Sequence, residues 1–224
     1  MDRYYENISC FLHDVFLKFY RNLVVSSVHG SLPSIHDGFI IISGHKCGAD
    51  PVILQAALDL YIHFIVDAQF FIKKSSDFFF SNFIGGLPGS TKYPLISVRG
   101  VREAIEKLKK GKIVGIFPEG IMIRDPYKIG KFKYGAAYLS MKTNKPVIPI
   151  YLKNIIPGPL PPNPNKCELG FEGFCSIFYN IGNRVDIFVG EPIFPDVLKI
   201  TKKNIVSFTE RIRRNFLNLI PGFN

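Results

Sequence analysis

The sequence contains no tryptophan and only four cysteines among its 224 residues, and it carries 18 acidic side chains against 28 basic ones. It also lacks any run of about 18 uncharged apolar residues, so a membrane-spanning helix is not expected. Acidic residues (Asp2, Glu6 and Asp14) interrupt the first apolar stretch, which is unlike a signal peptide. Without tryptophan, much of the aromatic content is 21 phenylalanines, and we expect some of them to face lipid rather than the core.

The four cysteines lie at spacings that match neither a CxxC pair nor a dense disulfide framework. Reduced thiols in a cytoplasmic protein are therefore favoured, and a Cys167–Cys175 disulfide in an oxidising compartment is the alternative. No third His, Cys or carboxylate stands at ligand spacing beside His45 and Asp50, so no metal site is expected.

The formal net charge of +10 is concentrated in one part of the chain. Residues 99–150 hold 12 basic and 4 acidic side chains, a net +8. A cationic surface attracts anionic bilayers, nucleic acid, acyl carrier protein or the phosphates of coenzyme A. Because no signature of a nucleic-acid-binding module accompanies the charge, we expect lipid and thioester partners and no nucleic acid.

Strand-like and helix-like patterns alternate along the chain, which predicts an α/β fold. We expect a single domain over residues 31–224, with a largely parallel or mixed sheet flanked by helices, and an amphipathic helical segment over residues 1–30. Helices are predicted at 8–23, 51–62, 98–110, 134–143 and 201–219, strands at 39–42, 64–71, 112–117, 146–152 and 184–189, a polar break at 26–31, and loops at 75–94 and 157–165.

The apolar residues of 8–23 recur at helical spacing, with Lys18 and Arg21 between them. This helix could lie in a membrane interface, with Phe11, Phe16 and Phe19 in lipid, or it could pack on the domain. Both alternatives stay open from the sequence. A second set of residues that could contact lipid or an acyl chain is Phe78, Phe79, Phe80 and Phe83.

His45 and Asp50 lie five residues apart after an apolar strand-like run. In a straight helix they would point apart, but Gly44 and Gly48 allow a sharp turn, and Pro51 fits the first position of a new helix. Asp50 could then hold one imidazole nitrogen while the other takes a proton from a hydroxyl. The alternative is that Asp50 only caps the helix and His45 is a loop residue.

Phe117-Pro118-Glu119-Gly120 follows a second apolar run. Glu119 stands where a buried strand ends, the place at which α/β folds bind ligands. Gly120 lets the backbone approach a substrate closely. The alternative is a turn acid paired with one of the nearby lysines.

Together and in this order, the two motifs resemble those of glycerolipid acyltransferases, which acylate lysophosphatidic acid or glycerol 3-phosphate. The resemblance extends from about residue 28 to about residue 215. Further blocks that are similar to the family are Ile41–Gly44, Gly130–Ala137, Val147–Ile150 and Gly190–Ile193.

The resemblance implies a catalytic pair, with His45 as general base and Asp50 holding it. A lysolipid hydroxyl, most simply that of 1-acylglycerol 3-phosphate, would attack an acyl thioester directly and give phosphatidic acid. The donor would be acyl-CoA or acyl carrier protein, with no cofactor, and no GxSxG nucleophile elbow is present. Glu119 and Gly120 would bind the acceptor. Because the acceptor lives in a bilayer, we expect a peripheral enzyme on the cytoplasmic face of an anionic membrane.

Two positions depart from the family pattern. The Thr and Arg that commonly follow Phe-Pro-Glu-Gly are Ile121 and Met122 here, and the nearest basic residue is Arg124. The family's second block places an Arg where Lys92 is the closest candidate. Either Arg124 and Lys92 bind the acceptor phosphate, or the acceptor is a lysolipid without it, such as an aminolipid or a glycolipid. A non-catalytic, basic membrane-binding protein is the third alternative.

Overall fold

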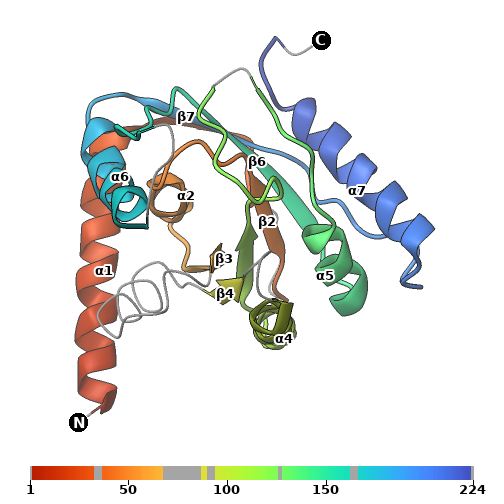
Figure 1. Cartoon of the computed structure of the whole chain (residues 1–224). Helices are drawn as coiled ribbons and strands as arrows, with labels where there is room; N and C mark the ends of the chain where they lie inside the picture. Colours follow the sequence, from red (N-terminus) through yellow and green to blue (C-terminus); the bar gives the residue numbers. More distant parts are fainter. Residues whose placement is uncertain are drawn as a thin grey trace.

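A seven-stranded β-sheet runs through the part of the chain that the computed structural model describes, residues 2–32, 37–67, 87–89, 94–125, 128–161 and 166–222 (Figure 1). The strand order is β1-β7-β6-β2-β5-β3-β4. The strands are β1 (Val25–His29), β2 (Ile40–Ser43), β3 (Ile62–Asp67), β4 (Leu87–Gly89), β5 (Ile113–Ile116), β6 (Val147–Lys153) and β7 (Val185–Val189).

Five neighbouring strands, from β6 through β2, β5 and β3 to β4, are parallel, whereas β7 is antiparallel to β6 and pairs in parallel with β1. In the central strand β2, Ile41 pairs with Gly115 of β5 and with Ile148 of β6. Every residue of β2 is buried, as expected for a parallel strand covered on both faces. The predicted α/β class with a mixed, largely parallel sheet is confirmed.

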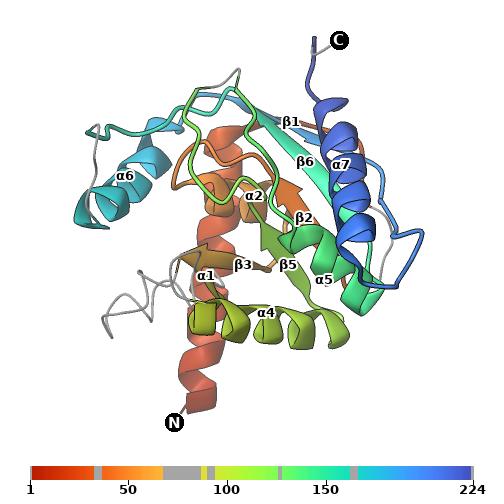
Figure 2. The same ribbon diagram turned by 45° about the vertical axis from the view of Figure 1, so that its right-hand side comes forward.

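Helices cover both faces of the sheet (Figures 1 and 2). Ile41 packs in the core with the first set of helices, whereas Ile40 and Ile42 point to the second set, because successive strand residues alternate between faces. The first set is α1 (Asp2–Val24) and α2 (Asp50–Leu58), and the second is α4 (Pro94–Lys109), α5 (Gly135–Thr143) and α7 (Lys202–Leu217). A further helix, α6 (Lys166–Tyr179), contacts α1.

The C-terminal half of α1 packs on the domain. Leu17, Tyr20 and Val24 are buried in the core on the α2 side of the sheet. The Tyr20 hydroxyl donates a hydrogen bond of 2.8 Å to the carbonyl oxygen of Ile177 in α6. Phe19, on another side of the helix, is 64% exposed. One face of this half of α1 therefore packs on the domain, whereas contact of Phe19 with lipid stays a prediction.

The remaining residues predicted to contact lipid are not tested by this arrangement. The side chain of Phe11 lies outside the described residues, as do Phe78, Phe79, Phe80 and Phe83. None of the helices in the described ranges combines the length and the apolar character needed to cross a bilayer. The N-terminal end of α1 extends beyond the rest of the domain in both views (Figures 1 and 2).

Two predicted boundaries near the N-terminus were wrong. β1 forms in the segment expected to be a polar break, because an edge strand with mostly exposed side chains needs little apolar pattern. The helix predicted to reach residue 62 ends at Leu58, because Asp59 adopts a left-handed conformation with φ of 54° and Ile62 already begins β3.

Two further elements differ from the prediction. β4 lies within the segment predicted to be a loop over 75–94, most of which is outside the described residues, and α4 begins at Pro94. The strand predicted over 64–71 is described only as far as Asp67. The whole of α6 was missed, and it proves to contact the candidate site.

Candidate active site

The two motifs meet at the carboxyl ends of the neighbouring parallel strands β2 and β5. The segment from His45 to Asp50, here called the dyad loop, connects β2 to α2, and Phe117–Gly120 follows β5. This edge of a parallel sheet is where α/β folds place ligands. The chain just after the second segment is bonded to the dyad loop, because the Ile123 backbone N–H donates a hydrogen bond of 2.7 Å to the His45 carbonyl oxygen.

His45 and Asp50 form a hydrogen-bonded pair. The distance from Nδ1 of His45 to Oδ2 of Asp50 is 2.9 Å, and Asp50 is fully buried while the His45 side chain is 22% exposed. An ionised carboxylate can only accept, so Nδ1 carries the proton and Nε2 of the neutral ring is left as an acceptor. A partly exposed imidazole in this tautomer is suited to take a proton from a hydroxyl.

The carboxylate of Asp50 is held by the loop itself and does not cap α2. Its Oδ2 atom also accepts the backbone N–H groups of Lys46, at 2.6 Å, and Cys47, at 3.0 Å. The N-cap residue of α2 is Ala49, which makes no side-chain capping bond. The capping alternative is therefore wrong, and the carboxylate instead folds the dyad loop around the imidazole.

Aromatic packing fixes the plane of the imidazole. The ring of Phe117 stacks on the imidazole of His45, with centroids 4.3 Å apart and an angle of 18° between the planes. The ring of Phe64, from β3, stacks on Phe117 with centroids 5.5 Å apart. Offset stacking of this kind contributes about 0.5–1.5 kcal/mol per pair beyond area burial. Phe117 thus has a local role that its place in the second motif did not suggest.

Glu119 connects the motifs through backbone contacts. It is buried, and its Oε2 accepts the His45 backbone N–H at 3.0 Å while its Oε1 accepts the Gly130 N–H at 2.7 Å. Charge-assisted bonds to backbone donors are among the stronger hydrogen bonds in proteins. The structure therefore gives Glu119 a positioning contact with His45 rather than a pairing with a nearby lysine side chain.

Gly120 lies beneath the side chain of Lys133. Gly120 has a positive φ of 64°, and a Cβ there would fall 2.4 Å from the Lys133 Nζ atom. The Lys133 ammonium lies 3.5 Å from the Gly120 carbonyl oxygen, and the Lys133 backbone N–H donates 2.7 Å to Pro118. A basic group that the sequence did not indicate is therefore placed beside the second motif.

Lys46, inside the dyad loop, is a buried basic residue that the sequence also did not indicate. Its ammonium donates to the carbonyl oxygens of Asp125, at 2.9 Å, and Lys128, at 2.7 Å. Burial lowers the pKa of Lys46, and the negative charge of Glu119 opposes that shift. Lys46 thereby ties the segment after the second motif to the dyad loop.

Of the two basic residues predicted to bind the acceptor, the structure describes only Arg124. Its guanidinium donates through Nη2 to the carbonyl oxygen of Gly158. Its buried Nη1 atom has no hydrogen-bond partner among the described residues. Lys92 lies outside them. Gly158 is buried here, although the sequence predicted an exposed loop over 157–165.

Glu172 of α6 is a functional candidate that sequence reasoning missed. Its side chain is fully buried, with Oε2 accepting the Gly48 N–H at 2.9 Å and Oε1 accepting the Gly158 N–H at 3.0 Å. Burial raises the pKa of Glu172, and these two N–H donors and Arg124 oppose the shift. The available signal was an acid between two phenylalanines, Phe171 and Phe174, in an aromatic-rich segment.

Gly48 is required for packing against α6 rather than for the sharp turn that the sequence predicted. Neither Gly44 nor Gly48 has a positive φ, so no glycine-only turn is made in the dyad loop. A Cβ on Gly48, however, would lie 2.4 Å from the Cα of Gly173 in α6. The glycine is therefore needed for close approach between the dyad loop and α6.

Cys47 is buried beside the dyad, with its Sγ donating 3.3 Å to Oδ1 of Asp50. Burial raises the pKa of the Cys47 thiol well above its usual value, and the Asp50 charge acts in the same direction. A protonated thiol is a poor nucleophile. Cys47 and Cys175 are both free, and the side chain of Cys167 lies outside the described residues.

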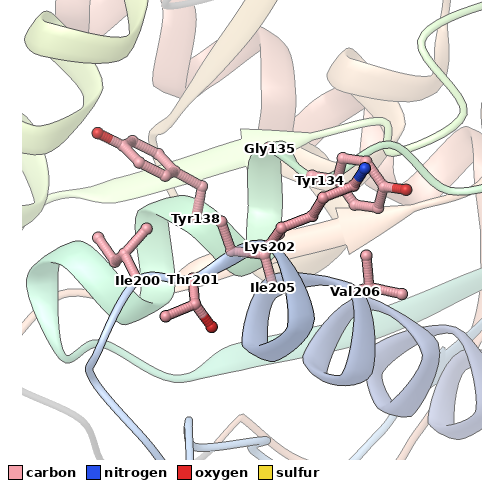
Figure 3. Close-up of a pocket in the computed structure, with 8 residues that line it drawn as sticks. All are labelled: Tyr134, Gly135, Tyr138, Ile200, Thr201, Lys202, Ile205 and Val206. Atoms are coloured by element: carbon pink, nitrogen blue, oxygen red, sulfur yellow. The ribbon is translucent and has the colours of Figure 1, made fainter.

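A pocket of mainly apolar lining lies apart from this site, between α5 and the start of α7 (Figure 3). None of its lining residues belongs to the dyad loop or to Phe117–Gly120. The residues that line the pocket are Tyr134, Gly135, Tyr138, Ile200, Thr201, Lys202, Ile205 and Val206.

No group of three His, Cys, Asp or Glu side chains that could hold a metal ion occurs in the described ranges.

The family model described as Acyltransferase matches residues 25–153, which include both motifs. The chain is similar to two chloroplastic 1-acyl-sn-glycerol-3-phosphate acyltransferases, BAT2 of Brassica napus, at 30% identity, and LPAT1 of Arabidopsis thaliana, at 31%, each over 129 residues. These matches cover 54% of this chain but only 35% and 33% of the relatives.

Another similar protein is the N-acylphosphatidylethanolamine synthase of Arabidopsis thaliana, 27% identical over 174 residues, which are 70% of this chain and 56% of that protein. Among solved structures, the fold is similar to the 1-acyl-sn-glycerophosphate (LPA) acyltransferase PlsC from Thermotoga maritima. The TM-score is 0.63 at 21% identity, covering 96% of this chain and 80% of that one.

Proposed function

The chain belongs to the acyltransferase family, and on that premise we propose that it transfers a fatty acyl group from a thioester to the hydroxyl of 1-acylglycerol 3-phosphate, giving phosphatidic acid. The observation that carries the proposal is the hydrogen bond of 2.9 Å between His45 and the buried Asp50, at the carboxyl ends of the parallel strands β2 and β5. The two chloroplastic relatives, by their names, act on the same acceptor.

In the proposed reaction, Nε2 of His45 takes the proton of the acceptor hydroxyl while its oxygen attacks the thioester carbonyl carbon. The resulting imidazolium is stabilised by Asp50 through Nδ1. When the tetrahedral intermediate collapses, the carbon–sulfur bond breaks, and the imidazolium returns the proton to the leaving thiolate. His45 ends neutral, and the products are the acylated lipid and a free thiol.

Arg124 and Lys133 are our candidates for the acceptor phosphate. Nη1 of Arg124 is a buried donor with no hydrogen-bond partner in the described part of the chain, and the Lys133 ammonium lies over Gly120. Charged donors of this kind form strong hydrogen bonds with phosphate oxygens. Lys92 remains a candidate from the sequence resemblance.

The donor we propose is acyl-CoA or acyl carrier protein, with no further cofactor. Both donors carry negative charge that the net +8 of residues 99–150 would attract. The acceptor is a bilayer lipid, so we propose that the enzyme works as a peripheral protein on the cytoplasmic face of an anionic membrane.

A second candidate function keeps the acyl transfer but changes the acceptor to a lysolipid without a phosphate, an aminolipid or a glycolipid. Met122 stands where the family's phosphate-binding Arg is common, which favours this alternative. The name of the similar N-acylphosphatidylethanolamine synthase describes acylation of a lipid nitrogen. An aminolipid acceptor is therefore the stronger version of the second candidate.

An acceptor panel tests the proposal. The protein is incubated with labelled acyl-CoA or acyl carrier protein and with lysophosphatidic acid, lysophosphatidylethanolamine or a lysoglycolipid, and the product is identified by mass spectrometry. We expect labelled phosphatidic acid as the main product. A main product from a phosphate-free acceptor or on a lipid amine would replace the first candidate by the second. Absence of any acylated product would indicate a membrane-binding protein without this catalysis.

A further inference from the structure

Helix α6 has the reverse of the polarity expected for a helix on a water-soluble domain. Phe171, Phe174 and Phe178 are 61%, 61% and 55% exposed. Their spacing of three and four residues places them on one face of the helix, here called the α6 aromatic face. The polar residues Glu172 and Ser176, and Asn180 just after the helix, are fully buried instead.

The buried polar side chains prevent α6 from turning its aromatic face inward. Glu172 accepts the backbone N–H groups of Gly48 and Gly158. Asn180 accepts the Ile156 N–H at 3.0 Å and donates to the Ile156 carbonyl oxygen at 2.9 Å. Rotating the helix would take these partners away from the backbone groups of Gly48, Gly158 and Ile156, which costs about 1–3 kcal/mol for each group that stays buried.

Two of these exposed phenylalanines contact each other. Phe174 and Phe178 pack edge to face, with centroids 4.9 Å apart. A cluster of large apolar side chains on an otherwise soluble domain marks a surface that is covered in the working protein. The α6 aromatic face is therefore suited to an apolar environment.

Basic side chains flank the C-terminal end of α6. Lys153 at the end of β6 and Arg184 at the start of β7 are both exposed. They are held near the helix end, because the Asn183 side chain donates to the carbonyl of Asn154, beside Lys153, and also contacts Asn180. Phenylalanine flanked by lysine and arginine is the pattern of an interfacial helix on an anionic bilayer.

We propose that the α6 aromatic face docks on an anionic lipid bilayer, with the three phenylalanines in the acyl boundary and Lys153 and Arg184 at the headgroups. The proposal rests on the proposed function for its choice of a bilayer, since the acceptor would be a membrane lipid. It adds a membrane-contacting element that lies outside the N-terminal helix and outside residues 25–153 that match the family.

Docking through α6 would place the membrane beside the reacting groups. Gly48 in the dyad loop bonds to Glu172 and packs on the backbone of Gly173. Only one thickness of helix therefore separates the docked face from the loop that holds His45. A lysolipid entering from the bilayer would have a short path to the imidazole.

Vesicle binding tests the proposal on the full chain. The probe is a vesicle of phosphatidylcholine with phosphatidylglycerol, and binding is measured by co-sedimentation for the wild type and for a variant with Phe171→Ser, Phe174→Ser and Phe178→Ser. We expect the partition coefficient to fall on the order of a hundredfold, since each phenylalanine loses apolar burial. The matched control changes three other exposed residues, Phe194→Ser, Val197→Ser and Leu198→Ser, and should bind like the wild type.

A fluorescence measurement that preserves the aromatic character makes the test independent of any loss of folding. Because the chain has no tryptophan, Phe174→Trp places a single tryptophan in the α6 aromatic face, and its emission can be followed separately from that of the tyrosines. We expect its emission to shift to the blue on adding vesicles and to be quenched by brominated lipid, and we expect neither effect for Phe194→Trp. Unchanged emission of Phe174→Trp on bound vesicles, or unchanged binding of the triple serine variant, would overturn the proposal.

Two controls separate this proposal from the proposed function and from a protein partner. His45→Ala should bind vesicles as the wild type does, so vesicle binding is measured without reference to catalysis. Conversely, the triple serine variant should still acylate a short-chain, monomeric lysolipid in solution. If the triple variant changes a wild-type dimer to a monomer and leaves vesicle binding intact, the α6 aromatic face is a dimer interface and the proposal is wrong.

Discussion

At the scale of single residues, the carboxylate of Asp50 determines how His45 is presented. One oxygen of Asp50 accepts hydrogen bonds from the imidazole Nδ1–H and from two backbone N–H groups of the dyad loop. Glu119 holds the backbone N–H of His45 from the other side. The imidazole is therefore oriented by two buried carboxylates, of which Asp50 touches the ring and Glu119 positions the main chain.

The thiol of Cys47 gives a prediction about reactivity. Burial and the nearby Asp50 raise the pKa of Cys47 above the usual 9.0, so the thiol stays protonated where an exposed cysteine begins to ionise. We expect iodoacetamide at about pH 8 to leave Cys47 unmodified in the folded protein and to modify it in urea, as measured by mass spectrometry of peptides. Cys175, which is only partly buried, is the internal control. Rapid alkylation of Cys47 in the folded protein would contradict this account of its environment.

Arg124 gives a prediction about acceptor binding. Replacing Arg124 by Gln removes the charged donor Nη1, and we expect KM for lysophosphatidic acid to rise by about tenfold to a hundredfold, because a hydrogen bond to a charged group contributes about 1.5–3 kcal/mol. The KM for the acyl donor should change little. Lys142→Gln, on the exposed side of α5, is the charge-matched control.

An unchanged KM for lysophosphatidic acid in Arg124→Gln, with normal thermal unfolding, would remove Arg124 from the phosphate site. In that case Lys133 and Lys92 would remain as the candidates. Since Arg124 also binds the Gly158 carbonyl, the unfolding measurement is needed to separate lost binding from a displaced loop.

At the scale of secondary-structure elements, the sequence predicted the helices and strands whose apolar residues recur regularly and are buried. β2 is apolar at its first three positions and buried at all four, and α7 buries Phe208, Ile212 and Phe216, which recur every four residues along the predicted helix. The local geometry of the dyad was also predicted, with His45 after a strand and Asp50 at a helix start. Glycine at 44 and 48 was correctly connected with this loop, but for the wrong physical reason.

The elements that were missed have patterns that local reasoning does not detect. α6 turns polar residues inward to bind backbone groups, so its hydrophobic pattern does not report its buried face. β1 is an edge strand whose exposure pattern resembles a polar loop. The contacts of Glu172 and Arg124 at Gly158 depend on segments more than ten residues apart, which no short motif records.

The close approach of the dyad loop to α6 leads to a prediction about Gly48. A Gly48→Ala methyl group would lie 2.4 Å from the Cα of Gly173, so one of the two backbones must move. We expect a loss of about 1–3 kcal/mol in the free energy of unfolding, measured in urea, and a large fall in kcat. Gly135→Ala is the control, since its Cβ would meet nothing within 4 Å, and it should keep both stability and activity. A fully stable and active Gly48→Ala variant would show that the approach to α6 is not required.

At the scale of the whole molecule, the candidate active site lies where the central strands of the sheet, α2 and α6 come together. The dyad loop joins the central strand β2 to α2, the second motif joins it from β5, and α6 covers it through Glu172. The sequence match to the family ends before α6, whereas the fold similarity covers nearly the whole chain. Helix α6 therefore lies outside the matched sequence, whereas the similarity in fold extends beyond that match.

We propose that His45, oriented by Asp50, is the base of an acyl transfer. A direct measurement compares the rate of free-thiol release from acyl-CoA, in the presence of lysophosphatidic acid, for the wild type and for His45→Ala, with thermal unfolding of both proteins followed in parallel. We expect kcat/KM to fall by about 10²–10⁴-fold while the unfolding temperature stays close to that of the wild type, since the side chain is partly exposed. A folded His45→Ala protein that releases thiol and forms phosphatidic acid at the wild-type rate would show that His45 is not the base.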